Sequence, residues 1–162
     1  MSDVLSLCRL LPELQVAAGH VLIEEGVPMG RVYVLKEGAF EVVRSGVRVV
    51  AVTQPGSFMG EISAVLGSAP MADVVAVRDS TVYIVDDAQE AARRDPALTY
   101  AIAQLLARRL QAVTSYLVDI KRQYAGTNTH LELMDQVLAN LMAMQQGASG
   151  GSGSERTDVP DY

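Results

Sequence analysis

The chain has 162 residues, 49% of them hydrophobic and 20% charged, which fits a globular domain with a substantial core. Its formal net charge of −6 disfavours a nucleic-acid surface, because binding to a phosphate backbone depends mainly on Lys and Arg. No apolar run reaches the roughly 18 residues of a membrane span. Residues 1–14 are interrupted by Asp3, Arg9 and Glu13, unlike a signal peptide or a transit peptide. Cys8 is the only cysteine, which excludes an intramolecular disulfide, and we expect a cytoplasmic protein without membrane contact.

Residues 14–86 are predicted to form the β-rich part of the chain. Short runs that are rich in β-branched residues and have the length of strands are separated by glycines. The runs are HVLIEE (20–25), RVYVLKE (31–37), AFEVVRS (39–45), VRVVAV (47–52), DVVAV (73–77) and TVYIVD (81–86). Between the third and the fourth run, Ser45-Gly46 is a two-residue hairpin signal. Strands this short and regular, with no long helix between them, indicate an antiparallel barrel or sandwich.

After Val85 the pattern becomes helical. Asp87, followed three residues later by Glu90, predicts a short helix that starts with a capping box. Asp95-Pro96 predicts the start of a longer helix, with Asp as the N-cap and Pro at the first helical position.

The C-terminal part is predicted to contain one more helix and a tail. Thr129–Glu132 is a capping box for that helix, which ends near Gln146. GASGGSGS and ERTDVPDY then indicate a flexible linker and a polar tail. The predicted organisation is a β-domain with its long helix at 1–125, an extra C-terminal helix at 126–146 and the linker with its tail at 147–162.

One face of the longer helix is apolar at a spacing typical of a coiled coil. From Ile102 onward, apolar residues recur at alternating intervals of mostly 4 and 3 residues. A second face with Leu98, Ala101 and Leu105 is available to the β-domain. We predict a homodimer through a helix pair; the alternative, in which the first face packs on the chain's own β-domain, stays open. The predicted dimer interface consists of Leu106, Leu110, Val113, Leu117, Ile120 and Tyr124.

Residues 56–77, GSFMGEISAVLGSAPMADVVAV, have the features of a phosphate-binding loop, except that they contain no Lys or Arg. Gly60 permits a tight turn before a short helix, and the backbone N–H groups at a helix start attract an anion. Glu61 supplies a carboxylate that accepts hydrogen bonds, as a sugar hydroxyl requires. The alternative is that Gly60 merely permits a turn and Glu61 is solvated.

The order of these elements resembles the cyclic nucleotide-binding domain of the Crp/Fnr family. The resemblance covers about residues 10–145, and PGSFMGEIS and ARRLQ are its most specific pieces. It implies an α+β fold, namely an antiparallel, jelly-roll-like β-roll with flanking helices and a long C-terminal dimerisation helix. It also implies a cyclic nucleotide as the ligand, with its ribose 2′-hydroxyl on Glu61 and its phosphate facing Gly60, Ile62 and Ser63.

The sequence departs from the family pattern at Met71, where the family has a phosphate-binding arginine. Met71 carries no charge, and Asp73 adds a negative charge near the expected phosphate. Removing one partner of a buried charged pair costs about 2–5 kcal/mol, which is roughly a 30- to 4,000-fold loss of affinity. Val75 and Val77 are expected to face the core, which directs Arg78 away from the site. The predicted ligand-binding residues are Gly60, Glu61, Ile62, Ser63, Met71 and Ala72.

Two functions fit this sequence. The first is a stand-alone cyclic nucleotide-binding-type sensor that signals through a helix-mediated dimer, with ligand binding weakened or altered by Met71, and with Val113–Tyr116 touching the base. The alternative is a ligand-independent dimerisation or partner-binding module in which Met71 fills the vacated space. In that case the helix after Thr129 supplies a surface for a protein partner.

Other classes of function are not expected. Only one further helix is predicted after the long one, so we expect no recognition helix and no direct DNA binding. His20 and His130 lie far apart, and no His, Cys or Asp spacing is typical of a metal site. Without a metal or a paired nucleophile and base, we expect neither catalysis nor any cofactor besides the cyclic nucleotide ligand.

Overall fold

The computed structural model describes residues 4–123, 136–137 and 139–140. The chain divides into two compact units, residues 1–107 and residues 108–162. Tyr124, the predicted capping box at Thr129, the linker and the tail lie outside the described residues.

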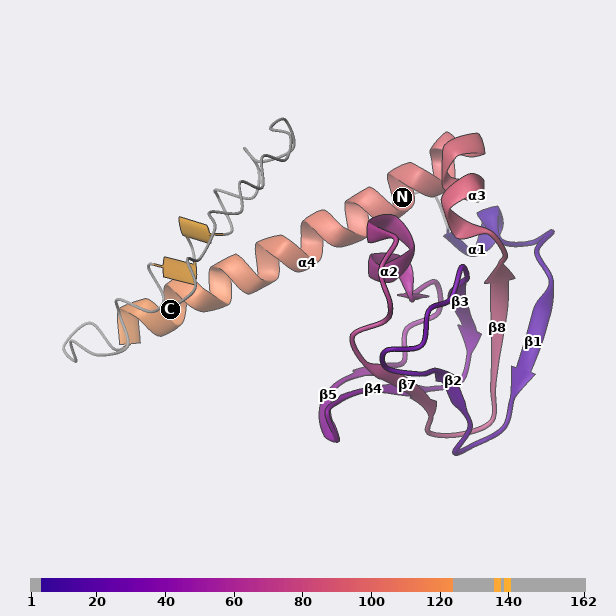
Figure 1. The fold of residues 1–162 in the computed structure, drawn as a ribbon, viewed down its shortest axis with the longest axis horizontal. Helices are drawn as coiled ribbons and strands as arrows, with labels where there is room; N and C mark the ends of the chain where they lie inside the picture. The colour runs from indigo at the N-terminus through magenta and orange to yellow at the C-terminus, as the bar shows by residue number, and fades with distance from the viewer. Residues whose placement is uncertain (1–3, 124–135, 138, 141–162) are drawn as a thin grey trace, which may run out of the picture. The chain divides into compact units, whose positions relative to one another are not determined.

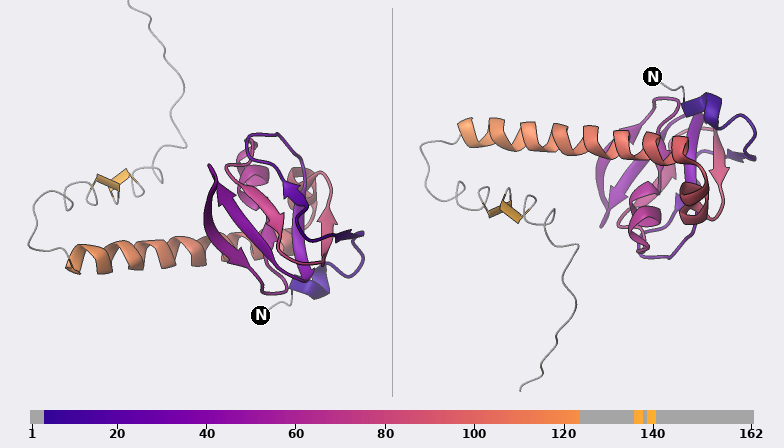
Figure 2. Two further views of the ribbon diagram at one scale, coloured as in Figure 1. Left: turned by 90° about the horizontal axis from the view of Figure 1, so that it is seen from below. Right: turned by 90° about the horizontal axis from the view of Figure 1, so that it is seen from above.

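The described part of the chain contains eight strands in two antiparallel four-stranded sheets, which form a β-roll (Figures 1 and 2). The first sheet has the order β1-β8-β3-β6 and the second β2-β7-β4-β5. The strands are β1 (Glu13–Val16), β2 (Val21–Ile23), β3 (Val32–Glu37), β4 (Phe40–Arg44), β5 (Val47–Val52), β6 (Phe58–Met59), β7 (Asp73–Ala76) and β8 (Ser80–Val85). The predicted fold class is confirmed, and each of the six predicted runs contains a strand.

The β4–β5 hairpin forms at the predicted turn. Ser45 and Gly46 both have positive φ, at 49° and 76°, as a type I′ turn requires. Arg44 pairs with Val47 at the base of this turn. A register shift opposite Val42 and Val43 then places one extra residue in β5. The hairpin signal is therefore confirmed.

Two clusters of buried side chains form the core of residues 1–107. One cluster fills the space between the sheets, where Leu35, Phe40 and Val82 are completely buried. The other lies between the first sheet and the helices and includes the buried Cys8. Because Val32, Val34 and Val85 of the first sheet belong to the second cluster, this sheet is covered on both faces.

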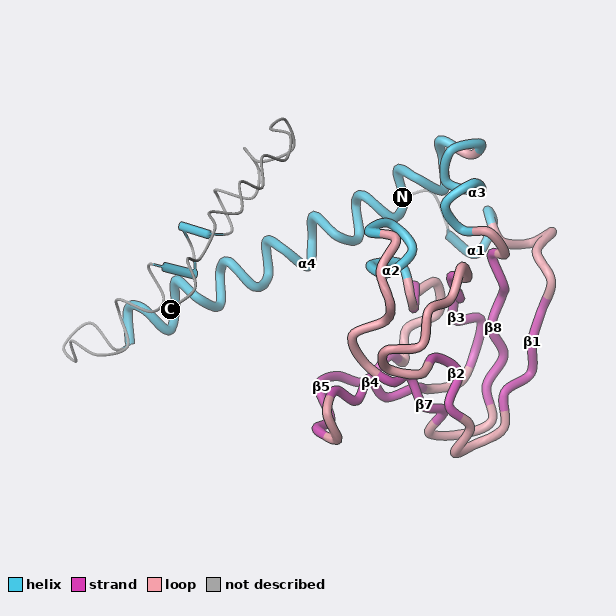
Figure 3. The backbone as a smooth tube through the Cα atoms, in the orientation of Figure 1, coloured by secondary structure: helices cyan, strands magenta, loops and turns pink. Residues whose placement is uncertain are grey.

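Within residues 4–123, four helices accompany the roll: α1 (Val4–Leu7), α2 (Glu61–Leu66), α3 (Ala88–Arg94) and α4 (Pro96–Gln123). In Figure 3, α1, α3 and the first turns of α4 gather at the end of the roll where β8 ends. Asp95 caps α4 as predicted, because its Oδ1 accepts hydrogen bonds from the backbone N–H groups of Ala97 (2.9 Å) and Leu98 (3.2 Å). None of the helices in the described ranges is long and apolar enough to cross a membrane.

The predicted capping box at Asp87 is wrong. Asp87 does precede α3, but its backbone is left-handed (φ 44°) and its side chain makes no capping hydrogen bond. A capping side chain requires an extended backbone at the N-cap, which turns its oxygen toward the first N–H groups. Glu90 instead pairs with Arg94 at 2.8 Å along α3.

The apolar residues of α4 divide into two groups. Leu98 and Ile102 are buried in the core beneath the first sheet, and Leu106, which the sequence assigned to the dimer interface, packs against the same cluster. Farther along α4, Leu110 and Val113 are exposed at 45% and 51%. Leu117 and Ile120 are half-buried. Leu106 is thus partly occupied by the core, and the predicted dimer interface itself stays a prediction.

Candidate functional site

Gly60 forms the tight turn that the sequence predicts. Its φ is +87°, and a Cβ at this position would lie 3.2 Å from the carbonyl oxygen of Arg31 and 3.2 Å from Cδ1 of Ile23. Both the left-handed backbone and the close approach of Arg31 favour glycine. Since Ile23 belongs to the core cluster between the sheets, Gly60 places the start of α2 at the edge of that space.

Glu61 is buried at the first position of α2, with 3% of its surface exposed. The alternative of a solvated Glu61 is therefore wrong. Ser63 is also buried, and its Oγ donates a hydrogen bond to the carbonyl oxygen of Gly60 at 2.9 Å. Ile62, in contrast, is 39% exposed. The turn thus holds a carboxylate inside the protein, which is unusual unless a polar partner or a function requires it.

Met71 and Ala72 lie in the segment between α2 and β7. Met71 is 52% exposed, so it does not fill buried space as the ligand-independent interpretation expects. Ala72 is half-buried. Asp73 begins β7, and its Oδ1 accepts a hydrogen bond of 2.6 Å from the backbone N–H of Glu25. The carboxylate of Asp73 therefore has a structural partner, which moderates the repulsion expected toward a phosphate.

The prediction that Val75 and Val77 face the core is wrong. Val74 and Ala76 are buried instead, while Val77 is 52% exposed. Arg78 nevertheless points away from the site, as predicted, but for another reason. Arg78 follows the end of β7 that is farther from Met71, and its guanidinium donates a hydrogen bond of 3.0 Å to the carbonyl oxygen of Gly38.

Glu25 connects three segments around this site. Besides the bond from its own N–H to Asp73, its Oε2 accepts a hydrogen bond of 2.9 Å from the backbone N–H of Ser45. The next residue, Gly26, donates its N–H to the carbonyl oxygen of Pro70 at 2.8 Å. The loop after β2 is thereby tied both to the β4–β5 hairpin and to the segment before β7. Sequence reasoning missed Glu25, because its partners are distant along the chain.

A cavity of about 410 Å³ lies beside the second half of α2. Its size is within the range of small-molecule sites. Of the predicted ligand-binding residues, only Ser63 lines it. The other residues that line it include Met29, Ala64, Ser68, Asp87 and Gln89. The cavity is therefore adjacent to the Gly60–Glu61 turn and is not centred on it.

α2 is connected directly to α3. The side-chain amide of Gln89 donates a hydrogen bond of 3.0 Å to the carbonyl oxygen of Ala64 in α2. Ala64 and Ala88 also belong to the same core cluster as Leu98 and Ile102 of α4. A displacement of α2 therefore has a physical route to the start of α4.

Most cations of residues 4–107 already have partners. Arg31 forms an ion pair of 2.6 Å with Asp86, and this hydrogen bond raises the pKa of Arg31 above its ordinary value. Arg48 pairs with Glu41 at 3.1 Å. Among the residues that the structure describes, no group of three or more His, Cys, Asp or Glu side chains is placed to hold a metal ion.

The family model that matches this chain is the one described as the cyclic nucleotide-binding domain, and it matches residues 13–90. The β-roll is a cyclic nucleotide-binding domain. The matched residues include the Gly60–Glu61 turn, all of α2 and the segment with Met71.

Two curated proteins are similar to part of this chain. The Pycsar effector protein XpPycTIR of Xanthomonas perforans is 34% identical over 113 residues, which cover 68% of this chain and 37% of that protein. The cGMP-dependent protein kinase egl-4 of Caenorhabditis elegans is 29% identical over 84 residues, which cover 52% of this chain and 11% of that protein. The chain therefore spans well under half the length of either relative.

Among solved structures, the chain is similar to the catabolite activator protein of Thermus thermophilus. The TM-score is 0.60 and the sequence identity 20%, with 95% of this chain and 88% of that chain covered. At this identity the similarity shows a shared fold: two antiparallel sheets in a β-roll, followed by a long helix.

Proposed function

We propose that this chain is a regulatory module of the Crp/Fnr type that binds a cyclic nucleotide at the Gly60–Glu61 turn and signals through α4. The observation that carries this proposal is the buried Glu61, held at the start of α2 by a left-handed glycine within a cyclic nucleotide-binding domain. Glu61 accepts a hydrogen bond from the ribose 2′-hydroxyl, and the N–H groups of Ile62 and Ser63 face the phosphate. Because Met71 offers no charge, the affinity is lower than an arginine at this position gives.

The response to the ligand starts at α2. A ligand that contacts Glu61 and the start of α2 stabilises one arrangement of this helix over another, by no more than its difference in affinity for the two. The bond from Gln89 to Ala64 and the shared apolar cluster pass this displacement to α3 and to the first turns of α4. The module itself performs no catalytic step. Its net charge of −6 also disfavours DNA as a direct partner.

Titration calorimetry with cyclic AMP and cyclic GMP tests the binding step. We expect heat of binding with at least one of them below about millimolar ligand. The 2′-deoxy form of the same ligand is the matched control, because it lacks only the hydroxyl that Glu61 accepts from. Losing a hydrogen bond to a charged group costs about 1.5–3 kcal/mol, so this form should bind about 10- to 150-fold more weakly. No heat at millimolar concentrations of either cyclic nucleotide contradicts the proposal.

The output of the module is a helix-mediated dimer. Leu110 and Val113 are exposed on α4, and apolar side chains at this spacing pair with a second helix. We expect sedimentation equilibrium to give twice the mass of 17.3 kDa at tens of micromolar chain. If the chain has the mass of a monomer both with and without ligand, the proposed dimer is wrong.

A second candidate function is a ligand-independent module that binds a protein partner. The observation that favours it is the apolar surface of α2, where Ile62, Val65 and Leu66 are 39%, 54% and 69% exposed. In this case the Gly60–Glu61 turn is structural. The calorimetric experiment separates the two functions, because only the first requires a cyclic nucleotide.

A further inference from the structure

The inference concerns the positive charge that the phosphate requires, and it rests on the proposed function. Met71 leaves the segment before β7 without a cation, yet the cyclic phosphate of a nucleotide carries one negative charge. Arg31, Arg48 and Arg78 are each engaged with a carboxylate or a carbonyl group. In contrast, the side chain of Arg44 makes no hydrogen bond or ion pair with any residue that the structure describes, and its backbone pairs with Val47.

Arg44 belongs to the row of β4 residues that faces the space between the sheets. Phe40 is completely buried in the core cluster there, and Val42 packs against the same cluster. Side chains two residues apart on a strand share a face, so Arg44 continues this row. It lies at the exposed end of the row, where the side chains pass from the core to solvent.

The strand register places Arg44 beside the segment that lacks its cation. In the ladder between β4 and β7, Val42 pairs with Val74 and Val43 pairs with Asp73. Continued by one residue, this register sets Arg44 opposite Ala72, the neighbour of Met71. An arginine at position 44 and an arginine at position 71 would therefore bring a positive charge to the same part of the site.

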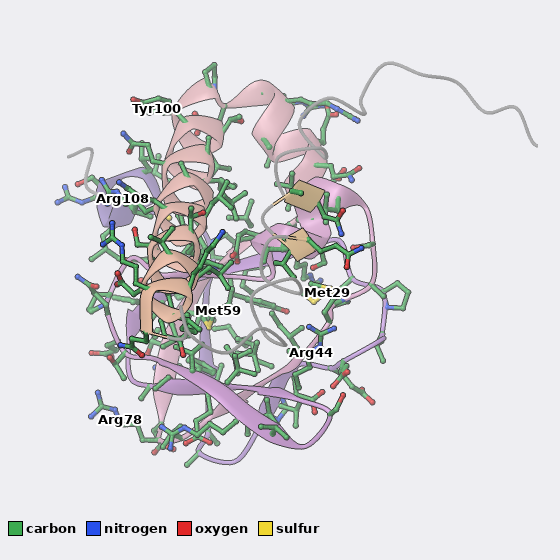
Figure 4. All side chains as sticks on the ribbon, turned by 90° about the vertical axis from the view of Figure 1, so that its left-hand side faces the viewer. Met29, Arg44, Met59, Arg78, Tyr100 and Arg108 are labelled. Carbon is green, nitrogen blue, oxygen red and sulfur yellow. The ribbon has the colours of Figure 1, made fainter. Side chains whose placement is uncertain are left out.

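Gly60 lies next to the same face of the second sheet, through Ile23. Val74 pairs with both Val42 of β4 and Ile23 of β2, and Cδ1 of Ile23 is 3.2 Å from the position of a Cβ on Gly60. Arg44 lies two residues beyond Val42, which is about 7 Å along the strand. A long arginine side chain covers such a distance. Figure 4 shows Arg78 at the lower left edge of the roll, well separated from Arg44.

Hydrogen bonds of neighbouring residues hold the backbone next to Arg44. Ser45, the next residue, donates its N–H to Glu25, whose own N–H is bound to Asp73. The hairpin base is thus tied to the start of β7 on one side of the site. We propose that Arg44 supplies the guanidinium that binds the phosphate of the cyclic nucleotide, in place of an arginine at position 71.

The test compares Arg44→Gln with Arg48→Gln by titration calorimetry. Arg48 is the matched control, because it lies in the same hairpin and pairs with Glu41 on the opposite face. The ligands are the cyclic nucleotide that binds the wild-type chain and its uncharged nucleoside. Since charged hydrogen bonds are the strong ones, we expect Arg44→Gln to weaken cyclic nucleotide binding about 10- to 150-fold. Nucleoside binding should stay unchanged, and Arg48→Gln should match the wild type.

Each of the other outcomes contradicts the proposal that Arg44 binds the phosphate. If the wild type binds the cyclic nucleotide and Arg44→Gln binds it equally well, Arg44 is not the phosphate ligand, while the proposed function stands. If Arg44→Gln weakens the nucleoside as much as the cyclic nucleotide, the residue acts on the shape of the site and not on the phosphate. If the wild type binds neither cyclic nucleotide, the proposed function fails and the role of Arg44 fails with it.

Discussion

Met71→Arg should strengthen binding of a cyclic nucleotide about 10- to 150-fold, the range of a hydrogen bond to a charged group. The new guanidinium would lie in the segment between α2 and β7, where the family has its phosphate-binding arginine. The larger values for buried charged pairs do not apply, because the side chain at this position is 52% exposed. The carboxylate of Asp73 reduces the gain only in part, since it already accepts the N–H of Glu25. Titration calorimetry with cyclic AMP and cyclic GMP measures the change.

Met71→Leu is the control for this substitution, because it keeps the apolar volume and adds no charge. Its affinity should equal that of the wild type. In the Arg44→Gln background, Met71→Arg should also restore binding if the two positions serve the same phosphate. Should Met71→Arg change nothing in either background, the rest of the pocket is not intact. That result favours the ligand-independent module.

The β-roll could be predicted from the sequence because its strands carry local signals. Runs such as RVYVLKE have strand length and are rich in β-branched residues, and Ser45-Gly46 fits only a turn with two positive φ angles. β6 could not be predicted in this way. It has two residues, Phe58 and Met59, and its pairing with Tyr33 and Val34 depends on the tertiary fold.

Which face of β7 is buried could not be predicted from the sequence, for a different reason. The run DVVAV has four successive apolar residues, so alternation does not distinguish its two faces. The ladder with β4 decides it, because Phe40 and Val42 face the core and pair with Ala76 and Val74.

For the candidate site too, some residues could be predicted from the sequence and others could not. Gly60 and Glu61 could be found because the turn and the carboxylate are adjacent in the sequence. Arg44 and Glu25 could not be found, since only the β4–β7 register, continued by one residue, sets Arg44 opposite Ala72, and Glu25 binds Asp73 across 48 residues. Counting alternate residues from Phe40 places Arg44 on the core face of β4, but only the register shows what lies opposite.

The largest loss of stability is expected for Gly38→Ala, at the junction between the two sheets. Gly38 lies between β3 of the first sheet and β4 of the second, with φ +113°. A Cβ there would lie 2.1 Å from Oγ, 2.4 Å from Cβ and 2.6 Å from Cα of Ser80. The last of these is a backbone atom, so a rotation of the serine side chain does not relieve the overlap. Strain at such a φ costs about 1–3 kcal/mol and overpacking about 1–3 kcal/mol, so we expect a loss of roughly 2–6 kcal/mol.

Urea denaturation followed by circular dichroism measures this loss, with Gly46→Ala as the control. Gly46 also has a positive φ of +76°, but a Cβ there meets no atom within 4 Å. Its substitution therefore reports the backbone strain alone, about 1–2 kcal/mol. The difference between the two variants measures the contact with Ser80, whose Oγ also accepts the N–H of Ala39 at 3.0 Å. Equal stability of the two variants would mean that the backbone around Gly38 and Ser80 shifts enough to accommodate the added Cβ. The two sheets would then be less firmly held together than the packing around Ser80 implies.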